Sequence, residues 1–162
     1  MGTVAREIVG EARQEIIVDL NRGVAAELND AYRYLLLSKL AAGLHAPAVA
    51  SFFADTARDE WRHMGEMIER IIQLGGRPMA GPHEAAELSY ASYEPPPGAD
   101  TDLSRMLEDS LKGERAAIRF YAALFGATKD VDPVTAEMAR AQLADEIADE
   151  DELEGLLAEG SG

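Results

Sequence analysis

The sequence predicts an all-helical protein, folded as a four-helix bundle with a long connection between the second and third helices. Three observations lead to this prediction. Ala, Leu and Glu are abundant and alternating Val, Ile or Thr patterns are nearly absent, which favours helix over strand. Apolar residues recur at helical spacing through four long runs. Pro and Gly gather between these runs, where helices end.

The four predicted helices are separated by helix-ending signals. Gly43 and Pro47 divide the first helix from the second, and Gly75-Gly76-Arg77-Pro78 closes the second. Thr101-Asp102 is suited to cap the third helix, and Pro133 suits the first position of the fourth. A short helical extension is expected before the first helix, and no fifth helix after the last. The expected helices cover residues 16–42, 48–74, 102–126 and 133–158.

The connection over residues 75–101 is rich in Pro and Gly and has no sustained apolar period. A connection of this length inside a compact domain needs a structural reason. At ~1.5 Å per residue a 26-residue helix is ~40 Å long, and an extended chain of similar residue number spans that distance easily. We therefore expect the connection to cross the full length of the bundle, which gives an up-down-down-up order.

Composition limits the classes of function. A chain of 162 residues suits a single domain, here 1–162. The net charge of −15 opposes binding to nucleic acid or an anionic membrane and favours attraction of cations. The absence of Cys excludes disulfides and thiolate metal sites. Neither an export signal nor an apolar stretch of about 20 residues is present, so we expect a cytoplasmic protein.

Glu60 and His63 form a Glu-x-x-His pair in the middle of the second helix. Residues three apart lie on one helix face, so both side chains can bind the same metal ion. Such pairs also occur by chance on exposed helices. Here the neighbours on the same face are apolar, including Phe53 and Met67, so the pair points toward the core. An ionised carboxylate costs several kcal/mol there unless it is neutralised, as a metal would do.

The pair belongs to an internal repeat. In an antiparallel helix pair, residues equally distant from the turn stand at the same height. Glu27 and Glu60 are symmetric about the turn at Gly43, and Glu114 and Glu146 are symmetric about the turn at Asp130. The first half therefore reads Glu then Glu-x-x-His. The second half reads Glu then Glu-x-x-Asp, ending at Asp149.

Four core-facing carboxylates at one level would repel each other and favour protonation unless cations lay between them. Two divalent ions bridged by carboxylates satisfy such a group, as in di-metal bundles in which two helices each supply a Glu and two supply Glu-x-x-His. The sequence therefore predicts a dinuclear site whose ligands are Glu27, Glu60, His63, Glu114, Glu146 and Asp149.

Several short segments in matching order carry a family resemblance: Leu20-Asn21, Glu27-Leu28, Tyr34, Glu60-Trp61-Arg62-His63, Leu74-Gly75-Gly76, Glu114-Arg115, Tyr121, Glu146-Ile147-Ala148-Asp149 and Leu153. With them the chain resembles the ferritin-like superfamily, and within it bacterioferritin and the archaeal-type Dps-like mini-ferritins. The resemblance covers roughly residues 20–157 and includes both the spacing and the order of the segments.

The resemblance implies a di-iron ferroxidase centre that oxidises ferrous iron with O2 or H2O2, inside a hollow homo-oligomer that stores ferric mineral. Two iron ions per subunit are implied, with Mn or Zn as substitutes. By matching positions, Glu27 and Glu114 are terminal ligands, Glu60 and Glu146 bridge the ions, and His63 binds one of them. The missing fifth helix favours a 12-subunit over a 24-subunit cage, on family analogy.

Three departures from these relatives stand out. Asp149 replaces the second His of bacterioferritin, which gives the second metal an all-oxygen shell. Trp61 stands where bacterioferritin has its haem-binding Met, so no haem is expected. The Cys pair of the archaeal-type Dps-like proteins is absent, as is the Lys-rich tail with which some Dps relatives bind nucleic acid.

Individual residues leave alternatives open. Tyr34 either hydrogen-bonds a ligand or takes an electron, or is a core residue whose hydroxyl is satisfied. Tyr32 and Tyr121 are expected in the core, Trp61 on the outer surface, and the acidic run that includes Asp145 on a solvated face. Two other functions fit the same residues: a manganese or mixed-metal oxidase or peroxidase on this fold, and a non-catalytic bundle whose metal site has decayed.

Overall fold

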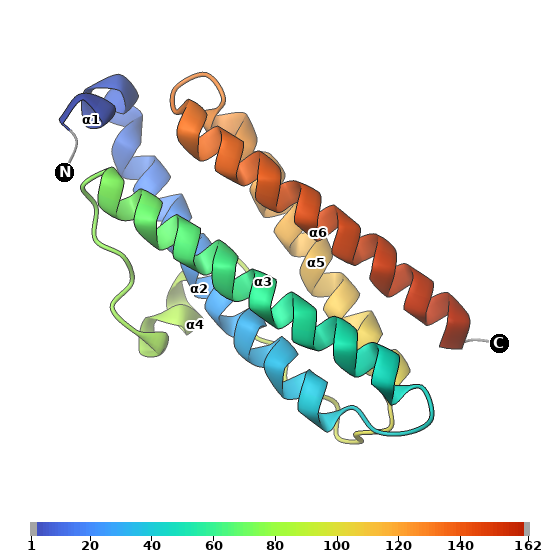
Figure 1. Cartoon of the computed structure of the whole chain (residues 1–162). Helices are drawn as coiled ribbons and strands as arrows, with labels where there is room; N and C mark the ends of the chain where they lie inside the picture. Colours follow the sequence, from blue (N-terminus) through green and yellow to red (C-terminus); the bar gives the residue numbers. More distant parts are fainter. Residues whose placement is uncertain (1–2, 161–162) are drawn as a thin grey trace.

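The computed structural model describes residues 3–160, and its four long helices form two antiparallel hairpins that lie side by side (Figure 1). The predicted all-helical bundle is confirmed, and no strand occurs in the described part of the chain. No further helix follows α6 within that part, and none of its helices is long and apolar enough to cross a membrane. The hairpins are α2 (Arg13–Leu40) with α3 (Ala46–Gln73), and α5 (Leu103–Thr128) with α6 (Pro133–Gly160).

Most helix ends follow the local signals in the sequence. Gly43 and Gly75 have positive φ angles of 112° and 78°, a backbone region that glycine enters without steric cost. The side chain of Asp102 accepts a hydrogen bond from the backbone N–H of Arg105 and so caps α5. Pro133 is the first residue of α6. The expected extension is the helix α1 (Thr3–Val9), which continues through the 3-10 turn η1 (Gly10–Ala12) into α2.

The connection between α3 and α5 crosses the length of the bundle alongside α2. It contains the 3-10 turn η2 (Pro82–Glu84) and the short helix α4 (Ala85–Leu88), which packs on α2. Four hydrogen bonds attach the connection to α2 and to the start of the loop that follows it, and in one of them the Asn21 side chain donates to the Arg77 carbonyl at 3.3 Å. The Asn21 side chain accepts from the Met79 N–H at 2.6 Å, Arg33 Nε donates to the Glu94 carbonyl at 2.9 Å, and the Ala42 N–H donates to the Asp100 carbonyl at 2.9 Å.

The core is divided into two apolar regions by a layer of charged side chains. One region contains Leu20, Met67 and Tyr121, and the other contains Phe53 and Met106. The layer between them consists of the glutamates predicted to stand at one height, all buried. Burying an ionised group without compensation costs several kcal/mol, so this layer is the least favourable part of the core.

A buried ion pair joins the hairpins at one end of the bundle. Arg70 Nη2 on α3 lies 2.6 Å from Asp132 Oδ1, and Arg70 Nε donates to Thr135 Oγ1 at 2.9 Å. Asp132 also caps α6, since its side chain accepts from the Thr135 N–H. The pair ties α3 to the start of α6.

Replacing Asp132 by Ala should lower the free energy of unfolding by about 3–5 kcal/mol, because the substitution leaves the charge of Arg70 buried and unpaired. Urea denaturation of the apo-protein measures the loss. Asp130→Ala removes an exposed carboxylate two residues away and should change the free energy by less than about 0.5 kcal/mol. Equal effects of the two substitutions would show that the ion pair does not hold the hairpins together.

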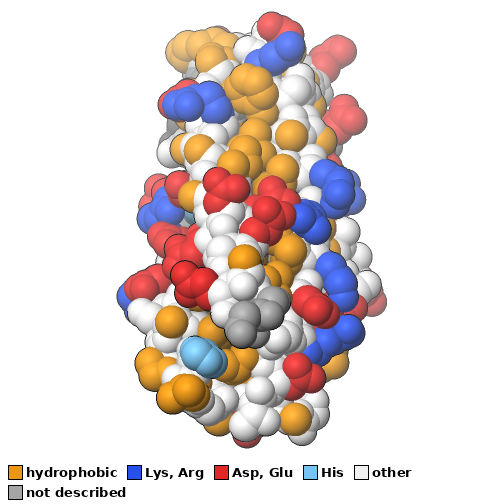
Figure 2. All heavy atoms as spheres, turned by 90° about the vertical axis from the view of Figure 1, so that its right-hand side faces the viewer, with side chains coloured by type: hydrophobic (Ala, Val, Ile, Leu, Met, Phe, Trp, Pro, Cys, Tyr) orange, Lys and Arg blue, Asp and Glu red, His pale blue; other side chains and the backbone are white. Residues whose placement is uncertain are grey.

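Figure 2 shows acidic side chains across the middle of one face of the molecule, with most Lys and Arg side chains along its edges. This face therefore lacks the continuous basic strip that binds a nucleic-acid backbone. The absence of a nucleic-acid partner stays a prediction.

Candidate metal centre

The predicted ligands come from all four long helices and meet in the charged layer. Glu27 lies on α2, Glu60 and His63 on α3, and Glu146 on α6. Each of these residues is at most 3% exposed. One ligand atom from each of the four lies within 4.8 Å of the ligand atoms of the others. This group therefore has the size and the chemistry of a metal site.

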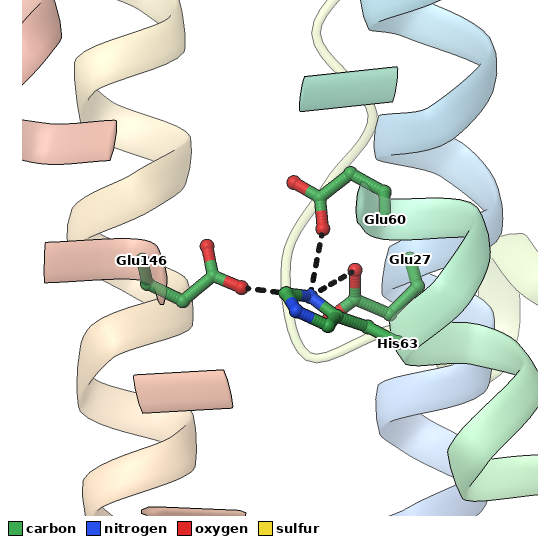
Figure 3. Close-up of side chains that lie close together, drawn as sticks. All are labelled: Glu27, Glu60, His63 and Glu146. Carbon is green, nitrogen blue, oxygen red and sulfur yellow. Dashed lines mark ion pairs between the residues drawn. The ribbon is translucent and has the colours of Figure 1, made fainter. Parts of the chain in front are cut away.

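Figure 3 shows three carboxylates directed at one nitrogen of His63. His63 Nδ1 lies 3.3 Å from Glu146 Oε1, 3.4 Å from Glu60 Oε2 and 4.0 Å from Glu27 Oε2. Glu60 and His63 share a face of α3 because they are three residues apart. Glu27 and Glu146 approach from opposite hairpins, so the site forms only when the two hairpins pack together.

Buried ligand atoms in this layer lack hydrogen-bond partners among residues 3–160. They are His63 Nδ1, Glu60 Oε2, Glu114 Oε2 and both carboxylate oxygens of Glu146. Buried polar groups in native proteins are almost always satisfied, and each exception calls for an explanation such as a bound ion. A divalent cation would satisfy carboxylate oxygens and an imidazole nitrogen together, so the donor set fits a metal.

Burial raises the pKa of Glu27, Glu60 and Glu146 well above the usual value for glutamic acid. The negative charge of neighbouring carboxylates raises the pKa of each of them further. Without cations, the folded protein therefore holds protons on carboxyl groups that would be ionised in the unfolded chain. A divalent ion would displace these protons.

Glu114 and Asp149 are the two predicted ligands that lie outside the four-residue group. Glu114, on α5, is 2% exposed, whereas Asp149 is only half-buried and lies outside the four-residue group. Burial, followed by the charges of Glu114, Asp59 and Glu152, raises the pKa of Asp149 to about 7. We call the four-residue group the compact half of the candidate centre, and Glu114 with Asp149, which offer only oxygen atoms, its open half.

Two tyrosines cross-connect the hairpins at this layer. Tyr34 on α2 donates a hydrogen bond to Glu114 on α5, and Tyr121 on α5 donates one to Glu27 on α2. Each tyrosine lies seven residues after the glutamate of its own helix. Tyr34 is therefore a partner of a predicted ligand. The expected place of Tyr121 in the core is confirmed, since it is fully buried. Its hydrogen bond to a predicted ligand was not predicted, although the seven-residue repeat was visible in the sequence.

Asp145 is half-exposed, as expected for a residue on a solvated face, and it also contacts a predicted ligand. Its Oδ2 lies 3.1 Å from His63 Nε2 and accepts a hydrogen bond from Arg62 at 2.9 Å. An ionised carboxylate can only accept, so in a hydrogen bond between Asp145 and His63 the proton lies on Nε2. The lone pair on Nδ1 then faces the glutamates, where it can bind a metal.

Replacing Asp145 by Asn should weaken metal binding by about 10- to 100-fold, because the amide no longer fixes the imidazole tautomer. Calorimetric titration of the apo-protein with Co²⁺ measures the change. Asp151→Asn removes an exposed carboxylate from the same helix and is the matched control. Equal Co²⁺ affinities of the two variants would exclude this role for Asp145.

Two aromatic residues near the centre point outward. Trp61 is 62% exposed, as expected for a residue on the outer surface, whereas Tyr32 is 60% exposed and its expected place in the core was wrong. The two residues line one hollow between α2 and α3.

Sequence reasoning also missed Asp30, which is half-buried and lies one helical turn from Glu27. Burial and the negative charges of Glu27 and Glu114 raise the pKa of Asp30.

A comparison with protein families finds that the model of the ferritin-like domain matches residues 17–161. The chain belongs to the ferritin-like family. This result confirms the resemblance drawn from the sequence. Within the family, the chain is 29% identical over 146 residues to the DNA protection during starvation protein of Pyrococcus furiosus, and the match covers 89% of this chain and 77% of that relative.

Solved structures of the ferritin-like family superpose closely on this chain. A dodecameric thioferritin from Bacteroides fragilis, a bacterioferritin-related protein, has a TM-score of 0.94 and 26% identity, with 99% of this chain and 95% of that chain covered. A Dps protein from Bacillus brevis has a TM-score of 0.83 at 19% identity, with 91% and 98% covered. The second likeness shows the fold alone.

Proposed function

We propose that this ferritin-like protein is a ferroxidase that binds two iron ions per subunit, oxidises Fe²⁺ with O2 or H2O2, and serves iron storage and detoxification. The observation that carries the proposal is the buried group Glu27, Glu60, His63 and Glu146, whose ligand atoms converge and are left largely without hydrogen bonds. Membership of the ferritin-like family supports the choice of iron.

Each ligand has a proposed role. Glu27 and Glu114 would be terminal ligands, Glu60 and Glu146 would bridge the two ions, and His63 would bind the ion in the compact half. Asp149 would complete the open half, and Tyr34 would hydrogen-bond Glu114. The chemistry is transfer of electrons from ferrous ions to the oxidant, and the fixed frame of carboxylates stabilises the ferric product because hard oxygen ligands favour it.

The test is to mix the purified apo-protein with Fe²⁺ without oxygen, admit air, and follow the formation of ferric iron by absorbance. Oxidation faster than in buffer is expected. Glu137→Gln removes an exposed glutamate of α6 and should oxidise iron like the wild type. A rate no greater than in buffer would exclude a ferroxidase.

We further propose that the chain assembles into a cage of identical subunits, with 12 favoured over 24. The likeness to a thioferritin described as dodecameric supports this number. Light scattering should give a mass close to twelve times the 17.5 kDa of one chain. A monomeric or dimeric mass would exclude the cage, and a mass of twenty-four chains would correct its size.

A second candidate function is a manganese or mixed-metal oxidase or peroxidase on the same fold. The specific observation in its favour is the open half of the centre, where Glu114 and Asp149 offer only oxygen atoms, the donors that suit Mn²⁺. The metal content of protein purified from its own source separates the two functions. Iron at both positions favours the ferroxidase, and manganese favours the second candidate.

A further inference from the structure

A second hollow, with a volume of about 200 Å³, lies between α2, α5 and the connection that joins α3 to α5. We call it the connection hollow. Two of its lining residues, Glu94 and Lys112, are exposed, so it opens to solvent. Small residues of α5 keep it open, because apart from the chain neighbours of Gly113 no side chain lies within 4 Å of the position that a Cβ atom would take there. The residues used below are Asp30, Arg33, Ala91 and Gly113.

The wall of the connection hollow borders the metal centre. Asp30 follows Glu27 by three residues on α2, and Gly113 directly precedes Glu114 on α5. The negative charges of both glutamates act on Asp30. The two glutamates proposed as terminal ligands therefore each lie beside a residue that lines the hollow.

Arg33 has unused hydrogen-bonding capacity in this wall. The residue is only 3% exposed, and it donates from Nε to the Glu94 carbonyl and from Nη1 to Ser110 Oγ, both at 2.9 Å. Its Nη2 is buried and has no partner among residues 3–160. The hydroxyl of Tyr90, the residue before Ala91, is also buried without a partner in that range. Buried polar groups are almost always satisfied, so a small hydrogen-bonding molecule is expected beside Arg33.

The charges of the hollow oppose the entry of ions of either sign. Arg33 is always charged and repels a metal cation. The net charge of −15 on the chain opposes an anion. Lys112 and Asp109 largely cancel each other, since their charged atoms lie 2.7 Å apart. A small neutral molecule that both donates and accepts hydrogen bonds meets neither barrier, and water and hydrogen peroxide are the two such molecules that the proposed reaction involves.

We propose that the connection hollow admits H2O2 to the centre and releases water, with Arg33 and Asp30 hydrogen-bonding the molecule as it passes; this inference rests on the proposed ferroxidase function. O2 is apolar and forms no such bonds, so its entry does not depend on these two side chains. At the centre the O–O bond of H2O2 breaks and two Fe²⁺ each give one electron. Two protons from solvent complete two water molecules, and two Fe³⁺ are the other products.

The first experiment compares Asp30→Leu with Asp19→Leu. The side chain of Asp30 makes no hydrogen bond or ion pair among residues 3–160, so leucine makes the wall apolar without removing a contact that holds the fold. Asp19 is also half-buried on α2, lies outside the hollow and pairs only with the exposed Arg22, so it is the matched control. Protein loaded with two Fe²⁺ per subunit without oxygen is mixed with H2O2 or with O2, each below saturation, and ferric absorbance is followed by stopped flow.

The rate with H2O2 should fall about tenfold in Asp30→Leu, the order expected when a polar molecule loses one hydrogen bond in a buried place. The rate with O2 should change by less than about twofold, because O2 needs no such bond. Asp19→Leu should match the wild type with both oxidants.

A second pair of variants fills the hollow without changing Asp30 or Arg33. Gly113→Leu should slow oxidation by H2O2 as Asp30→Leu does and leave the rate with O2 nearly unchanged. Gly126→Leu places the same side chain in open space elsewhere on α5 and should match the wild type. Leucine is a better helix former than glycine, so both variants should fold.

Equal slowing with both oxidants in Asp30→Leu would overturn the inference, because Asp30 would then only shape the centre. Unchanged rates with both would also overturn it, since peroxide would enter elsewhere. A wild type that uses O2 but not H2O2 would overturn the inference and leave the ferroxidase intact. Failure of the wild type to oxidise Fe²⁺ with either oxidant would overturn both proposals.

Crystals soaked with Co²⁺ give a readout that does not depend on turnover. The anomalous signal should appear among Glu27, Glu60, His63 and Glu146 and be absent from the connection hollow. A Co²⁺ ion bound at Asp30 would overturn the inference, because the hollow would then admit cations.

Discussion

Replacing Glu60 by Gln should slow the oxidation of Fe²⁺ by about 100-fold or more. Loss of a residue that only hydrogen-bonds a metal ligand typically lowers metal affinity or activity by about 10- to 100-fold, and loss of a ligand itself should have a larger effect. The same substitution should raise the melting temperature of the apo-protein. Burial and neighbouring carboxylates raise the pKa of Glu60, so its ionised form disfavours folding, and a neutral amide of similar shape removes that cost. Stopped-flow absorbance and calorimetry measure the two effects.

The combination of these two effects is diagnostic. A residue that only stabilises the fold would lose melting temperature on replacement, whereas a residue retained for metal binding should gain it. Glu137→Gln, the exposed control on α6, should change neither quantity. If Glu60→Gln left both iron oxidation and melting temperature at wild-type values, the group would be a decayed site, as one of the sequence-based alternatives supposes.

The glutamates of the centre were predictable because helix geometry fixes their height and face. A turn at Gly43 places Glu27 level with Glu60, and the 3.6-residue period directs both toward the core. The second hairpin repeats this arrangement with Glu114 and Glu146, and all four are buried in the structure. The height of a residue along the bundle can therefore be predicted from its distance to the turn, provided that the residue lies in a regular helix.

Residues whose position depends on how the hairpins pack were not predictable in the same way. Asp145 was assigned to a solvated face from its acidic neighbours, yet it contacts His63 of the other hairpin. Tyr90 lies in an irregular connection, where no period relates sequence distance to position. Asp149 occupies the position in the second hairpin that His63 occupies in the first, and the sequence therefore predicted it as a ligand. In the structure its side chain is half-exposed and lies outside the four-residue group.

The apo-protein should lose stability as the pH rises from about 5 to about 8. Glu27, Glu60, Glu146 and Asp149 have raised pKa values in the folded state, so the folded protein binds more protons than the unfolded chain. Protonation of these carboxyl groups stabilises the fold fully when the pH is below the pKa values that the groups have in the unfolded chain. This stabilisation is lost as the pH rises through their pKa values in the folded protein, which for Asp149 is about 7. A shift of one pKa unit corresponds to about 1.4 kcal/mol, or about 3 °C in melting temperature for a chain of this size.

Metal should reverse this trend, since a divalent ion takes the place of the protons and binds more tightly as the carboxyl groups lose them. Melting temperatures measured with and without Co²⁺ should therefore diverge as the pH increases. Asp149→Asn removes the group with a folded-state pKa of about 7 and should flatten the decline of the apo-protein between about pH 6 and about pH 8. A melting temperature of the apo-protein that rises over this range would mean that the buried carboxyl groups are already ionised without metal, and that their charges are compensated by something other than a cation.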